Sequence, residues 1–395
     1  MSAGTATFVS SRRKALLSRG WRAGLAVGLF SALLFTFVGN RLQVHGYTPP
    51  GLEQIWNSTA QDPQVAGQWT TQLLIALSRL LPGSSINTLT VMTIIGASFV
   101  QGFIAHDLVR RGWQPALAAL AVGLTGLHPV ILYLATNGSP TLIYAIAASL
   151  TITALDRLEA IGDTRSLIVM GLSVALLFLT WPNAIFFALP LALLLPLAFR
   201  AGRSVQSLAA MYLIIAAPSL IALSAVAIGG ELFALSWART IASWSSPLHG
   251  NSLEVVAQSS WLRAFGGKPM LAFLQSLALC AVIMPRGWVI LIRLLIRPTE
   301  RRQPATGLAA LLLPPLAGAL ATWFWQTSSA WSMLATSMLC CSAWATTVRF
   351  RRVEQRLWLL FILCGVVAGW TTPLLWGAPD LETWRRLVLA PLPLH

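Results

Sequence analysis

Residues 86–105 form an apolar run without a charged side chain: INTLTVMTIIGASFVQGFIA. A helix of about 20 such residues spans the hydrocarbon core of a bilayer, because each residue advances the helix by about 1.5 Å. Similar runs recur along the whole chain, at about 23–39, 113–134, 141–155, 166–180, 184–199, 205–228, 270–284, 305–325, 330–348 and 357–376. The sequence therefore predicts an all-α fold, a polytopic transmembrane helical bundle with about 11 spans.

The composition indicates a membrane protein. Only 10% of the 395 residues are charged and 56% are hydrophobic, and the mean hydropathy is +0.71. Soluble domains carry about 25% charged residues, so a water-soluble core is excluded. We expect a cytoplasmic segment at 1–22, one transmembrane domain at 23–376 and an outer tail at 377–395. The four cysteines lie in apolar runs, and no disulfide is predicted.

The 27 basic residues indicate the orientation of the chain. They lie at the ends of apolar runs and not on one face or arm, so the net charge of +15 does not predict nucleic-acid binding. Cytoplasmic loops hold the excess of Lys and Arg. One side of the membrane holds all the basic residues except seven, which are Arg41, Arg79, Arg239, Arg263, Lys268, Arg385 and Arg386. The N-terminus is therefore predicted in the cytoplasm and the C-terminus outside.

Amino-acid usage favours a bacterial inner membrane. Among the basic residues only Lys14 and Lys268 are lysines, and Ala and Leu dominate the apolar positions. This usage is typical of a high-GC bacterium. Membrane lipids are then the partners that the chain must contact.

The first long outer connection, residues 40–85, carries candidates for acid–base chemistry. Glu53 and Asp62 are its carboxylates, and a general base for transfer to a hydroxyl needs one such group. Asp62 precedes Pro63, which also suits the cap of a helix. That helix, residues 64–81, has glutamines at 64, 68 and 72 opposite Trp69 and several leucines, so we expect it to lie on the membrane surface.

The second long outer connection, residues 229–268, is expected to form two short amphipathic helices at 231–244 and 252–265. Trp244 and Trp261 lie there among Arg239, Arg263 and Lys268. Tryptophan stacks on sugar rings and arginine holds phosphate, so these five are candidate substrate-binding residues. An interfacial aromatic belt with charges for lipid headgroups explains the same mixture.

His128, followed by Pro129, lies toward the outer end of the predicted span at 113–134. The imidazole is suited to contact a phosphate or a metal, although a lone histidine near an interface is more often satisfied by a backbone carbonyl. No metal site is predicted. None of the 12 acidic residues falls inside a predicted span, which disfavours a proton- or sodium-coupled carrier.

On the cytoplasmic side, six acidic residues interleave with arginines. We expect solvated interfacial pairs at Asp107, Asp156, Glu159, Asp163, Glu300 and Glu354. Residues 288–296, interrupted by Arg293, are too short to span a bilayer and are expected to lie at the interface.

This layout resembles the GT-C superfamily of polytopic glycosyltransferases, which includes protein O-mannosyltransferases and lipid A aminoarabinose transferases. The resemblance is one of architecture. It covers the first span, the long first outer loop with its surface helix, and the tightly paired spans from 86 to 199, where Asp156-Arg157-Leu158-Glu159 closes one span. These parts make up roughly half of the chain.

The resemblance implies transfer of a sugar from a polyprenyl-phosphate donor on the outer face of the membrane. Glu53 or Asp62 would then be the catalytic base. The residues near the lipid phosphate would come from His128, Arg239, Arg263 and Lys268. A different class stays open: a non-enzymatic membrane protein, such as a lipid or polysaccharide flippase or a subunit of a membrane complex.

Overall fold

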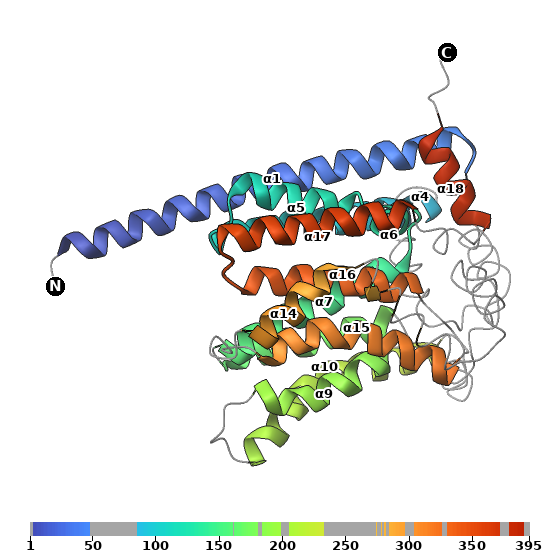
Figure 1. The fold of residues 1–395 in the computed structure, drawn as a ribbon. Coiled ribbons are helices and arrows are strands. Elements are labelled where there is room, and N and C mark those ends of the chain that lie inside the picture. Colours follow the sequence, from blue (N-terminus) through green and yellow to red (C-terminus); the bar gives the residue numbers. More distant parts are fainter. Residues whose placement is uncertain are drawn as a thin grey trace.

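The computed structural model describes residues 3–47, 85–160, 162–180, 184–198, 205–232, 274, 278, 280–281, 284–296, 304–325, 330–371 and 379–390. Every regular element in these ranges is an α-helix, and the helices pack side by side in one bundle (Figure 1). They are α1 (Ala3–Val44), α4 (Ser85–Arg110), α5 (Pro115–Gly126), α6 (Pro129–Thr136), α7 (Pro140–Ala160), α8 (Thr164–Thr180), α9 (Ala184–Ala198), α10 (Val205–Leu232), α14 (Arg286–Ile296), α15 (Pro304–Trp325), α16 (Ala330–Thr347), α17 (Arg352–Thr371) and α18 (Pro379–Leu389).

Within the described ranges, four helices are long and apolar enough to cross a membrane: Ser18–Val44, Thr88–Arg110, Thr141–Ala160 and Arg352–Thr371. The pair α5 and α6 makes a fifth candidate if it counts as one broken span. The prediction of an all-helical protein with several apolar, membrane-length helices is confirmed at this level. The total of about 11 crossings and the orientation of the termini stay predictions.

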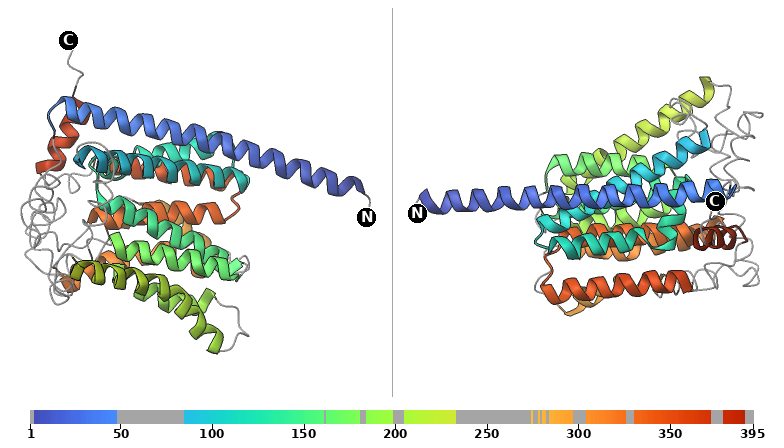
Figure 2. Two further views of the ribbon diagram at one scale, coloured as in Figure 1. Left: turned by 180° about the vertical axis from the view of Figure 1, so that it is seen from behind. Right: turned by 90° about the horizontal axis from the view of Figure 1, so that it is seen from above.

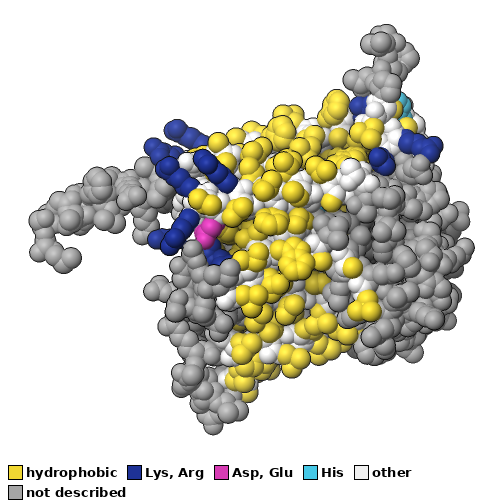
Figure 3. Space-filling model, viewed as in Figure 1, with side chains coloured by type: hydrophobic (Ala, Val, Ile, Leu, Met, Phe, Trp, Pro, Cys, Tyr) yellow, Lys and Arg dark blue, Asp and Glu magenta, His cyan; other side chains and the backbone are white. Residues whose placement is uncertain are grey.

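One end of the bundle is rich in arginine. Here the C-terminal ends of α4, α7 and α16 meet the N-terminal ends of α8, α15 and α17, and Arg111 Nη2 lies 3.7 Å from Asp156 Oδ2 across α4 and α7. Figure 3 shows Lys and Arg side chains gathered at this end beside a broad apolar surface. We call it the basic end, defined by Arg110, Arg111, Arg157, Arg165, Arg293, Arg349, Arg351, Arg352 and Arg356.

The opposite end is closed by aromatic side chains. Trp384 of α18 is fully buried, with its ring edge-to-face against Tyr133 of α6 and stacked on Trp370 of α17. Arg41 Nε of α1 donates to the carbonyl of Leu387 at 3.1 Å. We call it the aromatic end, defined by Tyr133, Trp370 and Trp384. The tail expected at 377–395 therefore includes a helix that packs on the bundle.

Glycines bring α1 and α4 into backbone contact. Gly20, Gly24 and Gly28 recur every fourth residue and so share one face of α1. A Cβ at Gly24 would lie 2.8 Å from the carbonyl oxygen of Gly102, and one at Gly20 would lie 3.1 Å from the ring of His106. Small residues at this spacing allow close helix packing in membranes. The first predicted span is thus part of a longer helix that lies along α4.

The expected single span at 113–134 is wrong in one respect, because the helix breaks in its interior. α5 and α6 meet at an angle of 66° between Gly126 and Pro129. Pro129 has no N–H to donate and its ring crowds the preceding turn. Trp370 Nε1 of α17 donates to the carbonyl of Leu127 at 3.1 Å, which satisfies one oxygen at the break.

α14 also differs from the expectation of an interfacial segment at 288–296. It is short, as expected, but one face lies inside the bundle, where Ile290 is fully buried and Arg286 is 2% exposed. Arg293, two turns later, reaches Glu354 at the basic end with an Nη1–Oε2 distance of 3.3 Å. α14 therefore extends from the interior to the basic end.

α10 continues further than the predicted span. It was expected to end near 228, with a new helix from 231, whereas the observed helix includes Glu231 and ends at Leu232. Two expected helices lie outside the described residues: the surface helix at 64–81 and the amphipathic helix at 252–265. Most of the amphipathic helix expected at 231–244 also lies outside them.

Candidate functional site

Of the residues predicted to form the outer site, the structure describes one, His128. The two candidate bases, Glu53 and Asp62, lie outside the described residues. So do the candidates in the second outer connection, which are Arg239, Trp244, Trp261, Arg263 and Lys268. Their predicted roles stay predictions.

His128 lies at the break between α5 and α6 and has no exposed surface. Its Nδ1 accepts a hydrogen bond from the backbone N–H of Val130 at 3.3 Å, so the imidazole caps the first turn of α6. The opposite edge of the ring lies against α17, where a Cβ at Gly369 would come within 2.8 Å of Nε2. In this arrangement His128 is a structural cap, and its contact with a phosphate stays a prediction.

A buried arginine lies near the same break. Arg286 of α14 donates from Nη1 to Thr125 Oγ1 of α5 at 3.3 Å and to Ser342 Oγ of α16 at 2.9 Å. No carboxylate of the described chain forms an ion pair with it. Removing an arginine from water without a carboxylate partner is costly. Sequence reasoning counted Arg286 only among the cytoplasmic charges, since nothing in its neighbourhood distinguishes it from Arg293.

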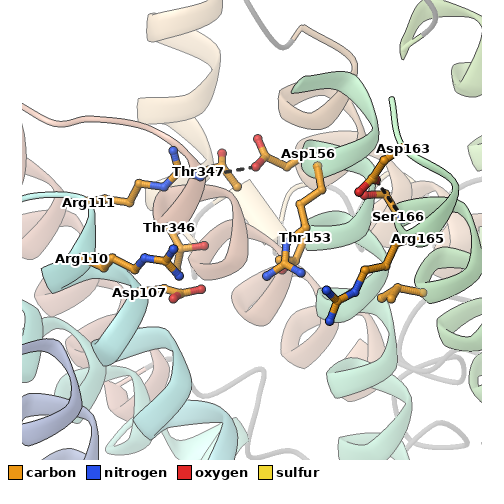
Figure 4. Close-up of a pocket in the computed structure, with 12 residues that line it drawn as sticks. Asp107, Arg110, Arg111, Thr153, Asp156, Asp163, Arg165, Ser166, Thr346 and Thr347 are labelled. Carbon is orange, nitrogen blue, oxygen red and sulfur yellow. Dashed lines mark hydrogen bonds and ion pairs between the residues drawn. The ribbon is translucent and has the colours of Figure 1, made fainter. Parts of the chain in front are cut away.

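A cavity of about 580 Å³ lies at the basic end, between α4, α7, α8 and α16. Its walls carry Arg110, Arg111, Arg157 and Arg165. They also carry Asp107, Asp156 and Asp163, so the lining has one more cation than anions. We call this cavity the charged pocket. Figure 4 shows Arg110 and Arg111 on one side of it and Arg165 across from them.

Two of the aspartates in the charged pocket have partners that fix them. Asp156 is 3% exposed and faces Arg111. Asp163 Oδ1 accepts from the backbone N–H of Ser166 at 3.0 Å and so caps the start of α8. Hydrogen bonds from the Ser166 hydroxyl and from its backbone N–H hold the pKa of Asp163 below its usual value. Asp163 is therefore ionised at neutral pH.

The remaining aspartate and three of the arginines complete the charged pocket. Asp107 Oδ1 lies 3.1 Å from His106 Nδ1. Arg110, Arg157 and Arg165 are all exposed, and none forms an ion pair with a residue that the structure describes. Three arginines from three helices are thus available to an anion in the cavity.

The expectation of solvated pairs on this side is wrong for two residues. Asp156 is buried, and Glu159 is 7% exposed. Glu159 accepts hydrogen bonds from the backbone N–H groups of Ala305 and Thr306, at 3.1 and 3.0 Å, and from the Thr306 hydroxyl at 2.7 Å. It therefore caps α15 from a distant part of the chain.

Within the described ranges, no group of three or more His, Cys, Asp or Glu side chains is arranged to hold a metal ion. Comparison of the chain with protein-family models, with curated proteins and with solved structures gives no match.

Proposed function

We propose that the chain is a multi-pass protein of a bacterial inner membrane, with about 11 crossings and its basic end in the cytoplasm. The support is the collection of arginines at the basic end, since cytoplasmic ends of membrane helices hold the excess of positive charge. The described helices also alternate in direction, because α4 runs toward the basic end and α5 with α6 returns. The aromatic end then faces outward.

Reporter fusions test this orientation. We expect a fusion after Arg302 to show cytoplasmic fluorescence and one after Leu394 to show activity of a periplasmic reporter. The reverse pattern at either position would contradict the proposed topology.

We infer further that the chain is a glycosyltransferase of the GT-C type, with a polyprenyl-phosphate sugar as donor. One observation supports an outer site built from both long connections. α1 ends at Val44, α4 begins at Ser85 and α10 ends at Leu232, and all three helix ends lie at the aromatic end (Figure 2). The connection that contains Glu53 therefore starts and ends at helix ends on this side of the bundle, and the connection that contains Lys268 starts at one.

In the proposed reaction the acceptor hydroxyl oxygen attacks the anomeric carbon of the donor sugar. Glu53 takes the hydroxyl proton, the bond between the sugar and the phosphate breaks, and the polyprenyl phosphate leaves. Arg239, Arg263 or Lys268 neutralises the charge on the departing phosphate. Trp244 and Trp261 stack on the sugar.

Substitution of the two acids tests the base. Removal of a required base lowers the rate by about 10² to 10⁴, so Glu53→Gln should nearly abolish glycan transfer while membrane insertion stays intact. Asp62→Asn should instead mainly weaken the predicted surface helix, because Asp62 is expected to cap it. Transfer is measured in cells that lack the native copy, and the amount of inserted protein is measured in parallel. Full transfer by both variants would remove the catalytic assignment.

The buried arginine favours a second candidate, a non-enzymatic flippase for an anionic lipid or glycolipid. Arg286 lies beside a broken helix, and an interior charge in a membrane protein commonly lies on a substrate pathway. Proteoliposomes with a fluorescent anionic lipid test it. If lipid flipping is unchanged in Glu53→Gln and lost in Arg286→Met, this candidate is supported over the transferase.

A further inference from the structure

We propose that the charged pocket binds the phosphate headgroup of an anionic membrane lipid, whose acyl chains lie on the apolar surface next to the pocket. This inference rests on the chain being a membrane protein and does not depend on glycosyl transfer.

The charge of the pocket selects an anion. Arg110, Arg157 and Arg165 come from α4, α7 and α8 and line one cavity. Figure 4 shows Arg110 and Arg165 on opposite sides of it. None of the three pocket carboxylates forms an ion pair with these arginines. Asp156 faces Arg111, Asp163 caps α8, and Asp107 contacts His106. Guanidinium groups donate paired hydrogen bonds to phosphate.

The position of the pocket matches the headgroup layer. The candidate span of α4 ends at Arg110, that of α7 ends at Ala160, and α8 begins at Thr164. The pocket therefore lies where helices leave the hydrocarbon core and enter the headgroup region. A cavity of about 580 Å³ is within the range that holds a small organic ligand, so a phosphoglycerol group fits.

Apolar side chains next to the pocket distinguish a lipid from a soluble phosphate. Phe103 lies one turn from Asp107 on α4, and Leu150 lies one turn from Thr153 on α7. Residues one turn apart share a helix face. Phe103 and Leu150 are 38% and 37% exposed. Each lies on the side of its pocket residue that points away from the basic end.

α8 repeats this arrangement from the opposite direction. Val169 lines the pocket, and Leu172, one turn further from the basic end, is exposed. On each of the three helices, an exposed apolar side chain thus lies one turn from a pocket residue, on the side away from the basic end. This pattern fits a ligand with a charged head and an apolar tail, and a nucleotide or a free phosphate would leave the apolar part unused.

Native mass spectrometry of the full chain in detergent tests the proposal. The probe is dioctanoyl phosphatidylglycerol, compared with dioctanoyl phosphatidylcholine and with glycerol phosphate. We expect the phosphatidylglycerol to bind at least about tenfold more tightly than either of the other two. The assignment of an anionic lipid would be overturned if the phosphatidylcholine binds as tightly as the phosphatidylglycerol. It would also be overturned if glycerol phosphate binds as tightly as the phosphatidylglycerol.

The triple variant Arg110→Gln, Arg157→Gln, Arg165→Gln locates the site. Each arginine near an anionic headgroup contributes roughly fivefold to affinity, so the triple variant should bind phosphatidylglycerol about a hundredfold more weakly. The matched control is Arg351→Gln, Arg352→Gln, Arg356→Gln, which removes three exposed arginines from the same end but none from the pocket. It should stay within about twofold of the unaltered chain.

If the triple variant and its control lose binding equally, the charged pocket is not the binding site. The result would show that all the arginines of the basic end attract the anionic lipid. If the triple variant does not fold by circular dichroism, the three single variants replace it, each with an expected loss of about fivefold. Single variants that all bind as the unaltered chain does would also overturn the proposal.

Discussion

The basic end and the aromatic end of the bundle are held together by different interactions. At the basic end, Glu159 connects α7 to α15 through three hydrogen bonds, one of them from a hydroxyl. At the aromatic end, Trp384 connects α18 to α6 and α17 mainly through ring contacts, with one long hydrogen bond from its Nε1 to Thr136 Oγ1 at 3.4 Å. Hydrogen bonds fix direction, whereas ring packing contributes mainly buried area. The two ends should therefore respond differently to substitution.

The largest effect is expected at the aromatic end. Trp384→Ala removes a fully buried ring, and such truncations cost about 3 to 5 kcal/mol. The loss falls on the docking of α18, so trypsin should cleave after Arg385 or Arg386 at least about 100-fold faster. Leu389→Ala, an exposed position on the same helix, is the control. A cleavage rate unchanged by Trp384→Ala would show that the ring contacts do not hold α18.

At the basic end the expected effect is somewhat smaller and depends on geometry. Glu159→Ala leaves the N–H groups of Ala305 and Thr306 without their acceptor, which costs about 2 to 4 kcal/mol of unfolding free energy. Glu159→Gln retains one acceptor oxygen and should lose about half as much. Chemical denaturation in detergent micelles measures both. Equal losses for the two variants would show that volume, and not hydrogen bonding, matters at this position.

The smallest effect on stability is expected between the two ends, at Arg286. The hydroxyls of Thr125 and Ser342 already donate to backbone carbonyls in their own helices, so Arg286→Met leaves no polar group without a partner. Replacing a buried charge by an apolar side chain is often neutral or stabilising. We expect a change within about 1 kcal/mol by the same denaturation measurement. A loss as large as that of Glu159→Ala would mean that Arg286 is a structural residue.

The hydropathy pattern predicts the helices well because length and apolar composition are local properties. The runs at 86–105 and 141–155 correspond to α4 and α7, each extended by a few residues at its ends. The break at His128 was missed because the apolar pattern continues through it. Pro129 inside an apolar run is compatible with a kinked span or with two helices, and the choice depends on the contact with Trp370.

The candidate sites show the limit of reasoning from local sequence. Asp156 and Glu159 were expected in solvent because arginine and acid alternate there, yet their burial depends on helices from much later in the chain. Arg286 differs from other cytoplasmic arginines only through Thr125 and Ser342. The partners of Glu159 and Arg286 are separated from them by more than 50 residues in sequence, and no pattern within one segment identifies them.

The glycine face of α1 has a consequence for how the protein tolerates sequence change. Because the backbones of α1 and α4 touch at Gly24 and Gly102, no side chain fits at either position without separating the helices. The opposite face of α1 exposes Leu25, Leu29 and Leu33, where any apolar residue of similar size is acceptable. Random mutagenesis of α1 should therefore leave functional chains that vary freely on one face and keep glycine at position 24 on the other.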